Sequence, residues 1–257
     1  MQECRGAATP LEPGLKLSKI MPSDQLDEKR KTAYRELIGS LMYIALRSRP
    51  DILFAVTKLS QFNSCPSETH WIQAKHVLRY LSRTVDYVIR YNTNEKPEIR
   101  IFCDADWAGD QDDRHSFTGM VVMIGPNIVQ WISSKQKCIS MSTMEAEYVA
   151  LASAVKEAKW LKMLLSELKL YDSLLGISNV YCDNKSAIEF SKSRVENSRT
   201  KHIDIAYHVV REELEKKSIR LSYVSSNENV ADIMTKNLKC IAHKNCTERL
   251  GIAKVGD

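Results

Sequence analysis

The chain has 257 residues, of which 44% are hydrophobic and 27% charged, and these proportions are those of an ordinary globular protein. Its formal net charge of +5 permits a polyanionic partner but does not require one. The seven cysteines are odd in number and form no C-x-x-C pair, which argues against a disulfide framework and favours a reducing, intracellular compartment. Because no run of about 18 apolar residues occurs, no membrane span is expected.

The first part of the chain is predicted to be helical. Residues 1–31 are rich in Pro, Gly and charge and are expected to form an extended lead-in. Residues 32–96 are expected to form a small helical module with Ser67 as an N-cap and a strand at 85–91. The expected helices cover about 34–42, 52–59 and 67–81.

The pattern changes at residue 97, where a second domain is predicted to begin and to run to residue 240. Its apolar stretches predict strands at 99–103, 117–124, 128–139, 177–182 and 219–224. Helices are predicted at 143–168, 186–191, 202–217 and 230–236. The order βββαβαβα predicts an α/β fold, a mixed five-stranded sheet with helices on both faces.

The remaining residues, 241–257, are expected to form a C-terminal tail. Cys240, His243 and Cys246 are spaced loosely like zinc ligands, but no fourth ligand is evident.

Four carboxylates stand where these elements begin or end: Asp104, Glu147, Asp183 and Asp232. Converging carboxylates repel one another unless a cation such as Mg²⁺ or Mn²⁺ compensates their charge. Two hard cations held by acids form a site for cutting or joining phosphodiester bonds. Taken singly, Asp183 and Asp232 could instead be helix caps, so the prediction rests on the order of all four acids along the elements.

Two of these acids have a close competitor. Asp106 shares the sheet face of Asp104 only if the strand continues that far, so Asp104 is preferred as the ligand. Ser142 and Glu145 have the spacing of an S-x-x-E capping box, which gives Glu145 a local role. Glu147 has no such role and is preferred as the catalytic acid.

Around these acids the chain resembles a known family. The segments IFCDADW at 101–107, STMEAEY at 142–148, YCDN at 181–184 and NVADI at 229–233 resemble the four acidic motifs of ribonuclease H. They resemble still more closely the C-terminal part of the Pol polyprotein of copia-type LTR retrotransposons. Similar in the same way are SFTG at 116–119, WISSKQ at 131–136, TKHID at 200–204 and YRELIGSLMY at 34–43. The resemblance covers about residues 32–240.

The resemblance implies a ribonuclease H fold that cleaves the RNA strand of an RNA–DNA hybrid. It also implies two divalent ions, normally Mg²⁺ with Mn²⁺ as the alternative, held by Asp104, Glu147, Asp183 and Asp232. Residues 32–96 would be the thumb and connection region that follows the polymerase domain of a reverse transcriptase, which would be a partner upstream. The implied location is intracellular: a cytoplasmic virus-like particle, with the nucleus as an alternative.

Two departures from the pattern qualify this interpretation. The catalytic motif of a reverse transcriptase is absent, since Asp112 and Asp113 lie in a polar loop, so the chain is not expected to polymerise DNA by itself. The loop before Asp232 also lacks the His that many ribonucleases H carry there, so slower turnover is expected. His202 and His208 lie on a preceding helix and are interpreted as structural.

Contacts with the substrate are expected to be mainly to phosphates and 2′-hydroxyls. The candidate contact residues are Asn184, Ser186, Ser134, Lys135, Gln136, Arg199 and Lys201. Two rival hypotheses remain: a catalytically idle or domesticated fragment that only binds nucleic acid or a partner, and a DNA integrase or resolvase of the same fold.

Overall fold

The computed structural model describes residues 4–19, 24–95, 97–170, 177–193 and 204–256. The chain divides into two compact units. Unit 1 comprises Met1–Arg90, Asp110–Arg114 and Lys236–Asp257, and unit 2 comprises Tyr91–Gly109 and His115–Thr235. The short segment Asp110–Arg114 counts with unit 1 because Asp110 forms a buried ion pair with Lys58, at 2.9 Å.

Unit 1 is mainly helical, as predicted for residues 32–96. Its elements are α1 (Glu28–Arg47), η2 (Pro50–Ile52), α2 (Leu53–Ser60), α3 (Glu68–Arg83), β1 (Tyr87–Ile89), α8 (Cys240–Arg249) and β7 (Ile252–Lys254). The first helix begins within the expected lead-in, because the Asp27 carboxylate caps it by accepting the Arg30 N–H at 2.8 Å. Ser67 caps α3, as its sequence context predicts.

The end of the chain differs from the expected tail. Residues 241–257 contain most of α8 and all of β7, which pairs antiparallel with β1 so that Tyr87 lies opposite Lys254 and Ile89 opposite Ile252. Leu250 and Ile252 are buried in unit 1. The prediction missed this segment because its pairing partner lies far away in the sequence and β7 is too short to show a periodic pattern.

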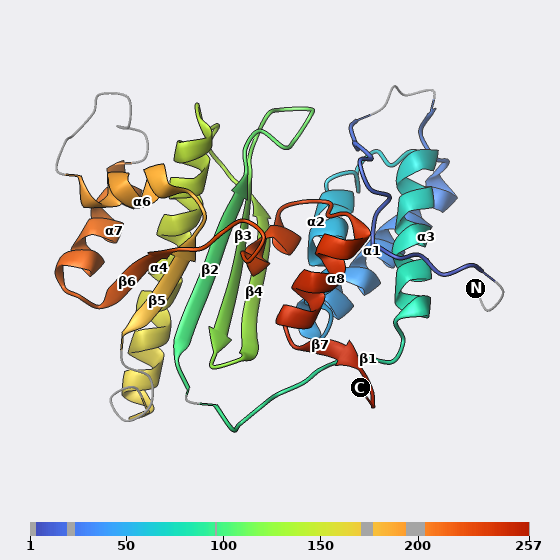
Figure 1. Cartoon of the computed structure of the whole chain (residues 1–257). Helices are drawn as coiled ribbons and strands as arrows, with labels where there is room; N and C mark the ends of the chain where they lie inside the picture. The colour runs from blue at the N-terminus through green and yellow to red at the C-terminus, as the bar shows by residue number, and fades with distance from the viewer. Residues whose placement is uncertain (1–3, 20–23, 96, 171–176, 194–203, 257) are drawn as a thin grey trace. The chain divides into compact units, whose positions relative to one another are not determined.

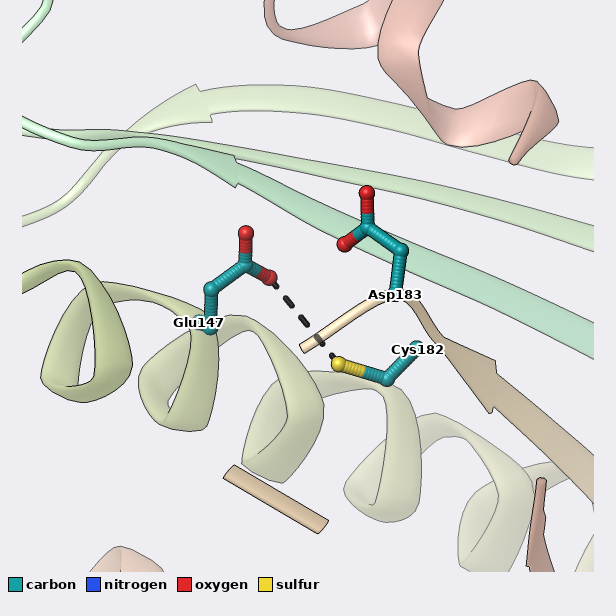
Figure 2. Close-up of side chains that lie close together, drawn as sticks. All are labelled: Glu147, Cys182 and Asp183. Atoms are coloured by element: carbon teal, nitrogen blue, oxygen red, sulfur yellow. Dashed lines mark hydrogen bonds between the residues drawn. The ribbon is translucent and has the colours of Figure 1, made fainter. Parts of the chain in front are cut away.

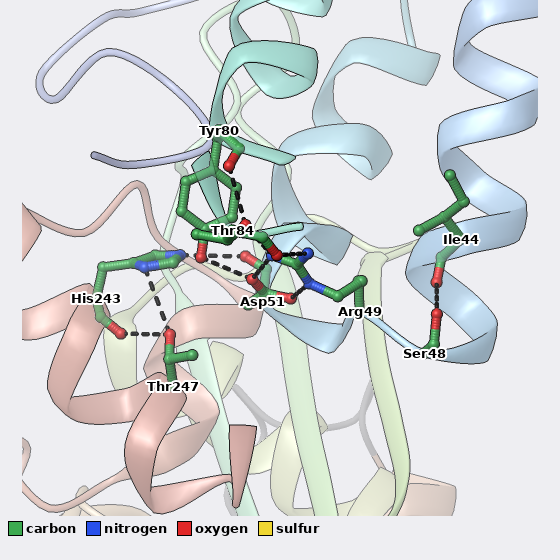
Figure 3. A network of polar contacts seen from close by, with 8 residues as sticks. All are labelled: Ile44, Ser48, Arg49, Asp51, Tyr80, Thr84, His243 and Thr247. Carbon is green, nitrogen blue, oxygen red and sulfur yellow. Dashed lines mark hydrogen bonds and ion pairs between the residues drawn. The ribbon is translucent and has the colours of Figure 1, made fainter. Parts of the chain in front are cut away.

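A buried polar network ties α8 to the rest of unit 1 (Figure 3). The Arg49 guanidinium donates to both carboxylate oxygens of Asp51, at 2.9 and 2.7 Å, and to the carbonyl oxygen of Thr84 at 3.0 Å. The Tyr80 hydroxyl donates to Asp51 at 2.7 Å, and Nε2 of His243 on α8 lies 3.1 Å from the Asp51 carbonyl oxygen. His243 thus takes part in packing the end of the chain.

Unit 2 contains the expected mixed five-stranded sheet. Its strands are β2 (Ile99–Asp106), β3 (Phe117–Ile124), β4 (Asn127–Lys135), β5 (Ser178–Cys182) and β6 (Ile219–Tyr223). They lie in the order β4-β3-β2-β5-β6 (Figure 1). Strand β3 is antiparallel to both of its neighbours, β2 and β4, whereas β5 and β6 run parallel to β2. The hairpin turn falls between β3 and β4 as predicted, but β4 ends at Lys135 instead of 139.

Helices of unit 2 cover both faces of this sheet. They are α4 (Thr143–Glu167), α6 (Lys185–Lys192), α7 (Asp204–Glu215) and the 3₁₀ helix η4 (Val230–Met234). Alternate β2 residues, among them Ile101 and Cys103, share a buried core with α4. The residues between them point to the opposite face. There Gly119, the β3 partner of Asp104, lies against η4.

The described helices include none that is both long enough and apolar enough to cross a membrane.

Candidate active site

The fold brings the four predicted acids together. Among the described residues, Asp104, Asp183 and Asp232 each offer a carboxylate oxygen, and these atoms lie within 4.8 Å of one another. Glu147, Cys182 and Asp183 form a second such group within the same limit (Figure 2). Asp183 belongs to both groups and so links Glu147 on α4 to the two other aspartates.

Sheet register explains why Asp104 and Asp183 meet. Cys103 on β2 is the parallel partner of Cys182 on β5, so the residue that follows each of them stands at the same level of two neighbouring strands. Asp104 is fully buried, whereas Asp183 is only partly buried. Asp232 lies on η4, which packs against β2 and β3.

The competition between Asp104 and Asp106 is decided by what each side chain contacts. β2 does continue to Asp106, so strand alternation places both carboxylates on one face. However, Asp106 bends over the turn that follows: a Cβ added to Gly109 would lie 2.0 Å from Asp106 Oδ2. Only Asp104 belongs to the group with Asp183 and Asp232.

Glu145 and Glu147 also make different contacts, which distinguishes their roles. Ser142 caps α4 by accepting the Glu145 N–H at 3.2 Å. The Glu145 carboxylate accepts the N–H of Met141 at 2.7 Å. In a standard S-x-x-E capping box it would accept the N–H of the N-cap, Ser142, which is the next residue. Glu147 is buried and turns toward Cys182, with its Oε2 atom 4.0 Å from the Cys182 Sγ atom (Figure 2).

Two thiols line the buried side of the acids. Cys182 and Cys103 are both buried, and the Cys103 thiol donates to the Tyr181 carbonyl oxygen at 3.4 Å. Hydrogen bonding to Cys182, together with burial, raises the pKa of Cys103 well above its usual value. Because a protonated thiol is a poor nucleophile, Cys103 behaves as a small hydrophobic residue that packs beneath the site.

Three polar residues that were not predicted as site residues bond to the acids or to the backbone beside them. Ser226 donates its hydroxyl to Asp183 Oδ2 at 2.6 Å. The hydroxyl of Thr235 donates to Asp104 Oδ2, and the amide of Asn229 donates to the Cys103 carbonyl oxygen at 2.9 Å. Only Asn229 carried a sequence signal, because an Asn directly before a short helix is a typical N-cap.

The donor set fits a hard divalent cation. Several carboxylates within 4.8 Å of one another disfavour each other's ionised form unless positive charge compensates. Mg²⁺ and Mn²⁺ prefer such carboxylate oxygens. The site can therefore bind a divalent ion through Asp104, Asp183 and Asp232, with Glu147 on the other side of Asp183.

Similar sequences are found among the curated Pol polyproteins of transposons. No family model matches the chain. It is 39% identical to the retrovirus-related Pol polyprotein from transposon TNT 1-94 of Nicotiana tabacum, over 98% of its own length and 19% of that protein's. It is 37% identical to the corresponding polyprotein from transposon RE1 of Arabidopsis thaliana, over 99% of its own length and 17% of that protein's.

The chain belongs to the Pol polyproteins of copia-type retrotransposons. It spans less than a fifth of the length of these curated relatives. Among solved structures, the N-terminal ribonuclease H domain of a Mycobacterium tuberculosis protein, fused to maltose-binding protein, is 15% identical with a TM-score of 0.39, over 60% of this chain and 98% of that one.

The residues predicted to contact substrate differ from one another in exposure and in their contacts. Ser134 and Ser186 are exposed, and Lys135 is partly buried. Asn184 caps α6 by accepting the Ala187 N–H at 3.0 Å. Arg199 and Lys201 lie outside the described residues.

Gln136 has a structural role where a substrate contact was predicted. Its side chain is buried, and its amide nitrogen donates to Thr118 Oγ1 at 3.0 Å and to the Ala146 carbonyl oxygen at 2.9 Å. Its amide oxygen accepts the Ser140 hydroxyl at 3.1 Å. These bonds join the end of β4 to the first turn of α4, and they explain why the strand stops before 139.

Proposed function

We propose that this chain is the ribonuclease H of a copia-type retroelement and hydrolyses the RNA strand of RNA–DNA hybrids during reverse transcription. One observation carries the proposal: the carboxylates of Asp104, Asp183 and Asp232 converge within 4.8 Å on a sheet of ribonuclease H order. The polymerase domain would come from another part of Pol, since the chain spans 19% or less of its relatives.

In this proposal each acid has a defined task. Asp104, Asp183 and Asp232 would hold one Mg²⁺ ion, and Glu147 with Asp183 would hold a second, so Asp183 is the shared ligand. Bound Mg²⁺ would supply activation of water and stabilisation of the leaving 3′ oxygen. Burial of Asp104 and Glu147 limits the number of carboxylate orientations and so fixes the ligand geometry before substrate arrives.

Two substitutions test this assignment of the metal ligands. Asp183→Asn removes the shared ligand and is expected to lower cleavage of a labelled RNA–DNA hybrid by at least about 100-fold, because metal-ligand substitutions remove transition-state charge stabilisation. Asp106→Asn is the matched control, since Asp106 lies on the same strand and face but outside the group. It is expected to stay within about threefold of the unsubstituted chain.

Three results would contradict the proposal. Equal cleavage by Asp183→Asn and the unsubstituted chain would remove the catalytic role of Asp183. Binding of hybrid without cleavage by the unsubstituted chain would favour a nucleic-acid-binding fragment. Cleavage of duplex DNA in preference to hybrid would favour an integrase or resolvase.

A further inference from the structure

The short helix η4, which carries Asp232, is hydrogen-bonded to β2 by residues before and after Asp232. Before it, the Asn229 amide donates to the Cys103 carbonyl oxygen at 2.9 Å, next to Asp104. After it, the Thr235 hydroxyl donates to the Asp104 carboxylate itself. Both side chains are almost completely buried, with exposed fractions of 1% and 0%. Water therefore does not compete for these two hydrogen bonds.

Thr235 contacts two of the three aspartates of the site, Asp104 and Asp232. Its hydroxyl bonds to the side chain of Asp104, and its backbone N–H donates to the Asp232 carbonyl oxygen at 3.2 Å. Asn229 uses its remaining amide oxygen to accept the Ala231 N–H at 3.2 Å, which starts η4. Hydrogen bonds to β2 thus flank η4 at both of its ends.

Strand β3 carries a glycine, Gly119, at the point where η4 approaches it. A Cβ added to Gly119 would lie 2.7 Å from Thr235 Cγ2 and 2.8 Å from the Ala231 carbonyl oxygen. Both distances are shorter than real Cβ contacts allow, so η4 could not approach β3 this closely over any other residue.

We propose that Asn229 and Thr235 are positioning residues that hold η4 against β2 and thereby set the Asp104–Asp232 separation at which divalent cations bind. The proposal rests on the proposed function for its catalytic consequence, but its first effect is on metal affinity. Residues that orient metal ligands typically contribute about 10- to 100-fold in affinity or activity.

The test compares substitutions that differ only in the hydroxyl or amide. Thr235→Val keeps the shape of the side chain and removes the hydroxyl, whereas Thr235→Ser keeps the hydroxyl. Asn229→Ser keeps an N-cap acceptor and removes the donor to Cys103. Mn²⁺ binding to the full chain is measured by calorimetry, and hybrid cleavage is measured as a function of Mg²⁺ concentration. Thermal unfolding in the absence of metal shows whether each variant folds.

Thr235→Val and Asn229→Ser are expected to weaken Mn²⁺ binding by about 10-fold or more and to raise the Mg²⁺ concentration for half-maximal cleavage in parallel. Thr235→Ser is expected to stay within about threefold on both measures. Unchanged Mn²⁺ affinity in a folded Thr235→Val or Asn229→Ser chain would overturn the proposal, as would equal losses in Thr235→Val and Thr235→Ser.

Two different outcomes separate the positioning role of Asn229 and Thr235 from the proposed nuclease function. If Thr235→Val binds Mn²⁺ like the unsubstituted chain while Asp183→Asn is inactive, the nuclease assignment stands and the positioning role falls. If the variants lose Mn²⁺ affinity but the unsubstituted chain cleaves no hybrid, the positioning role stands and the nuclease assignment falls.

Discussion

Gly119 is a position where one methyl group is expected to disturb the candidate site. Gly119→Ala places a Cβ 2.8 Å from a backbone oxygen of η4, so the helix must move away from the sheet. Overpacking of this kind costs roughly 1–3 kcal/mol of unfolding free energy. We expect that loss, measured by denaturant unfolding, together with weaker hybrid cleavage, because Asp232 moves with η4.

Gly39 provides the matched control for this substitution. It lies exposed on α1, and a Cβ there would meet nothing within 4 Å. Gly39→Ala is therefore expected to stabilise the chain by roughly 0.5–1 kcal/mol through helix propensity and to leave cleavage unchanged. If Gly119→Ala behaved like Gly39→Ala, the close approach of η4 to β3 would be wrong.

At the scale of elements, the start of α3 depends on a neutral histidine. His70 Nδ1 accepts the Ser67 N–H at 3.0 Å, which completes the capping box, and the ring stacks on Phe62 with centroids 3.9 Å apart. Burial lowers the pKa of His70 from 6.5 to about 4. Protonation of Nδ1 would remove the acceptor, so the proton destabilises the helix start.

The sign of the pH dependence follows from linkage. Between pH 6.5 and about 4 the unfolded chain binds a proton at His70 that the folded chain does not, so stability falls as the pH is lowered through this window. This histidine alone is expected to remove about 2 kcal/mol between pH 7 and pH 5. Hydrogen exchange of the α3 amides at the two pH values, corrected for intrinsic rates, measures the loss.

His70→Gln tests this assignment, because Gln is a normal partner of Ser in a capping box and does not titrate. The variant loses the ring stacking on Phe62 and is expected to be less stable at pH 7. Its further loss between pH 7 and pH 5 should nevertheless be smaller than that of the unsubstituted chain by about 2 kcal/mol. An equal loss in both chains would assign the pH dependence to other groups.

Elements with a local signal could be predicted from the sequence, and those that depend on distant partners could not. Helix α4 and strands β2, β3 and β5 were predicted within a few residues, because apolar periodicity and caps such as Ser142 are local. The end of β4 was misplaced because Gln136 leaves the strand to bond with α4. Helix α8 was missed because its buried face is explained only by contacts with the rest of unit 1, which is distant in the sequence.

The same distinction applies to the site. Asp104 and Asp183 end apolar strands, and their placement on neighbouring parallel strands follows from the predicted order of elements. The role of Thr235 could not be predicted, because its bond to Asp104 joins residues 131 positions apart. Nothing in the residues around Thr235 distinguishes it from a buried threonine of an ordinary core.

At the scale of the whole molecule, the sequence of unit 2 lies between the two longer segments of unit 1, Met1–Arg90 and Lys236–Asp257. Deleting residues 241–257 would remove the strand partner of β1, the buried Leu250 and Ile252, and His243 from the polar network. Loss of the two aliphatic side chains alone is expected to cost roughly 3–6 kcal/mol. Hydrogen exchange should then show lost protection in β1 and α3 and retained protection in β2 and β5.

A chain shortened by only its last two residues is the control for this deletion, and it is expected to keep full protection in β1. Retained protection of β1 after removal of 241–257 would contradict the structural role of the C-terminal segment. Equal loss of protection in β2 would show instead that the two units unfold together.

The pairing of β1 with β7 also affects the order of events during synthesis. Strand β1 cannot pair until Lys254, the partner of Tyr87, has left the ribosome, so unit 1 is completed only after that residue has been made. Every strand of the unit 2 sheet, and η4 with it, has been made by Met234. Domains usually fold in the order in which they are translated. Here the unit that is started first is expected to finish folding last, after the sheet of unit 2 has formed.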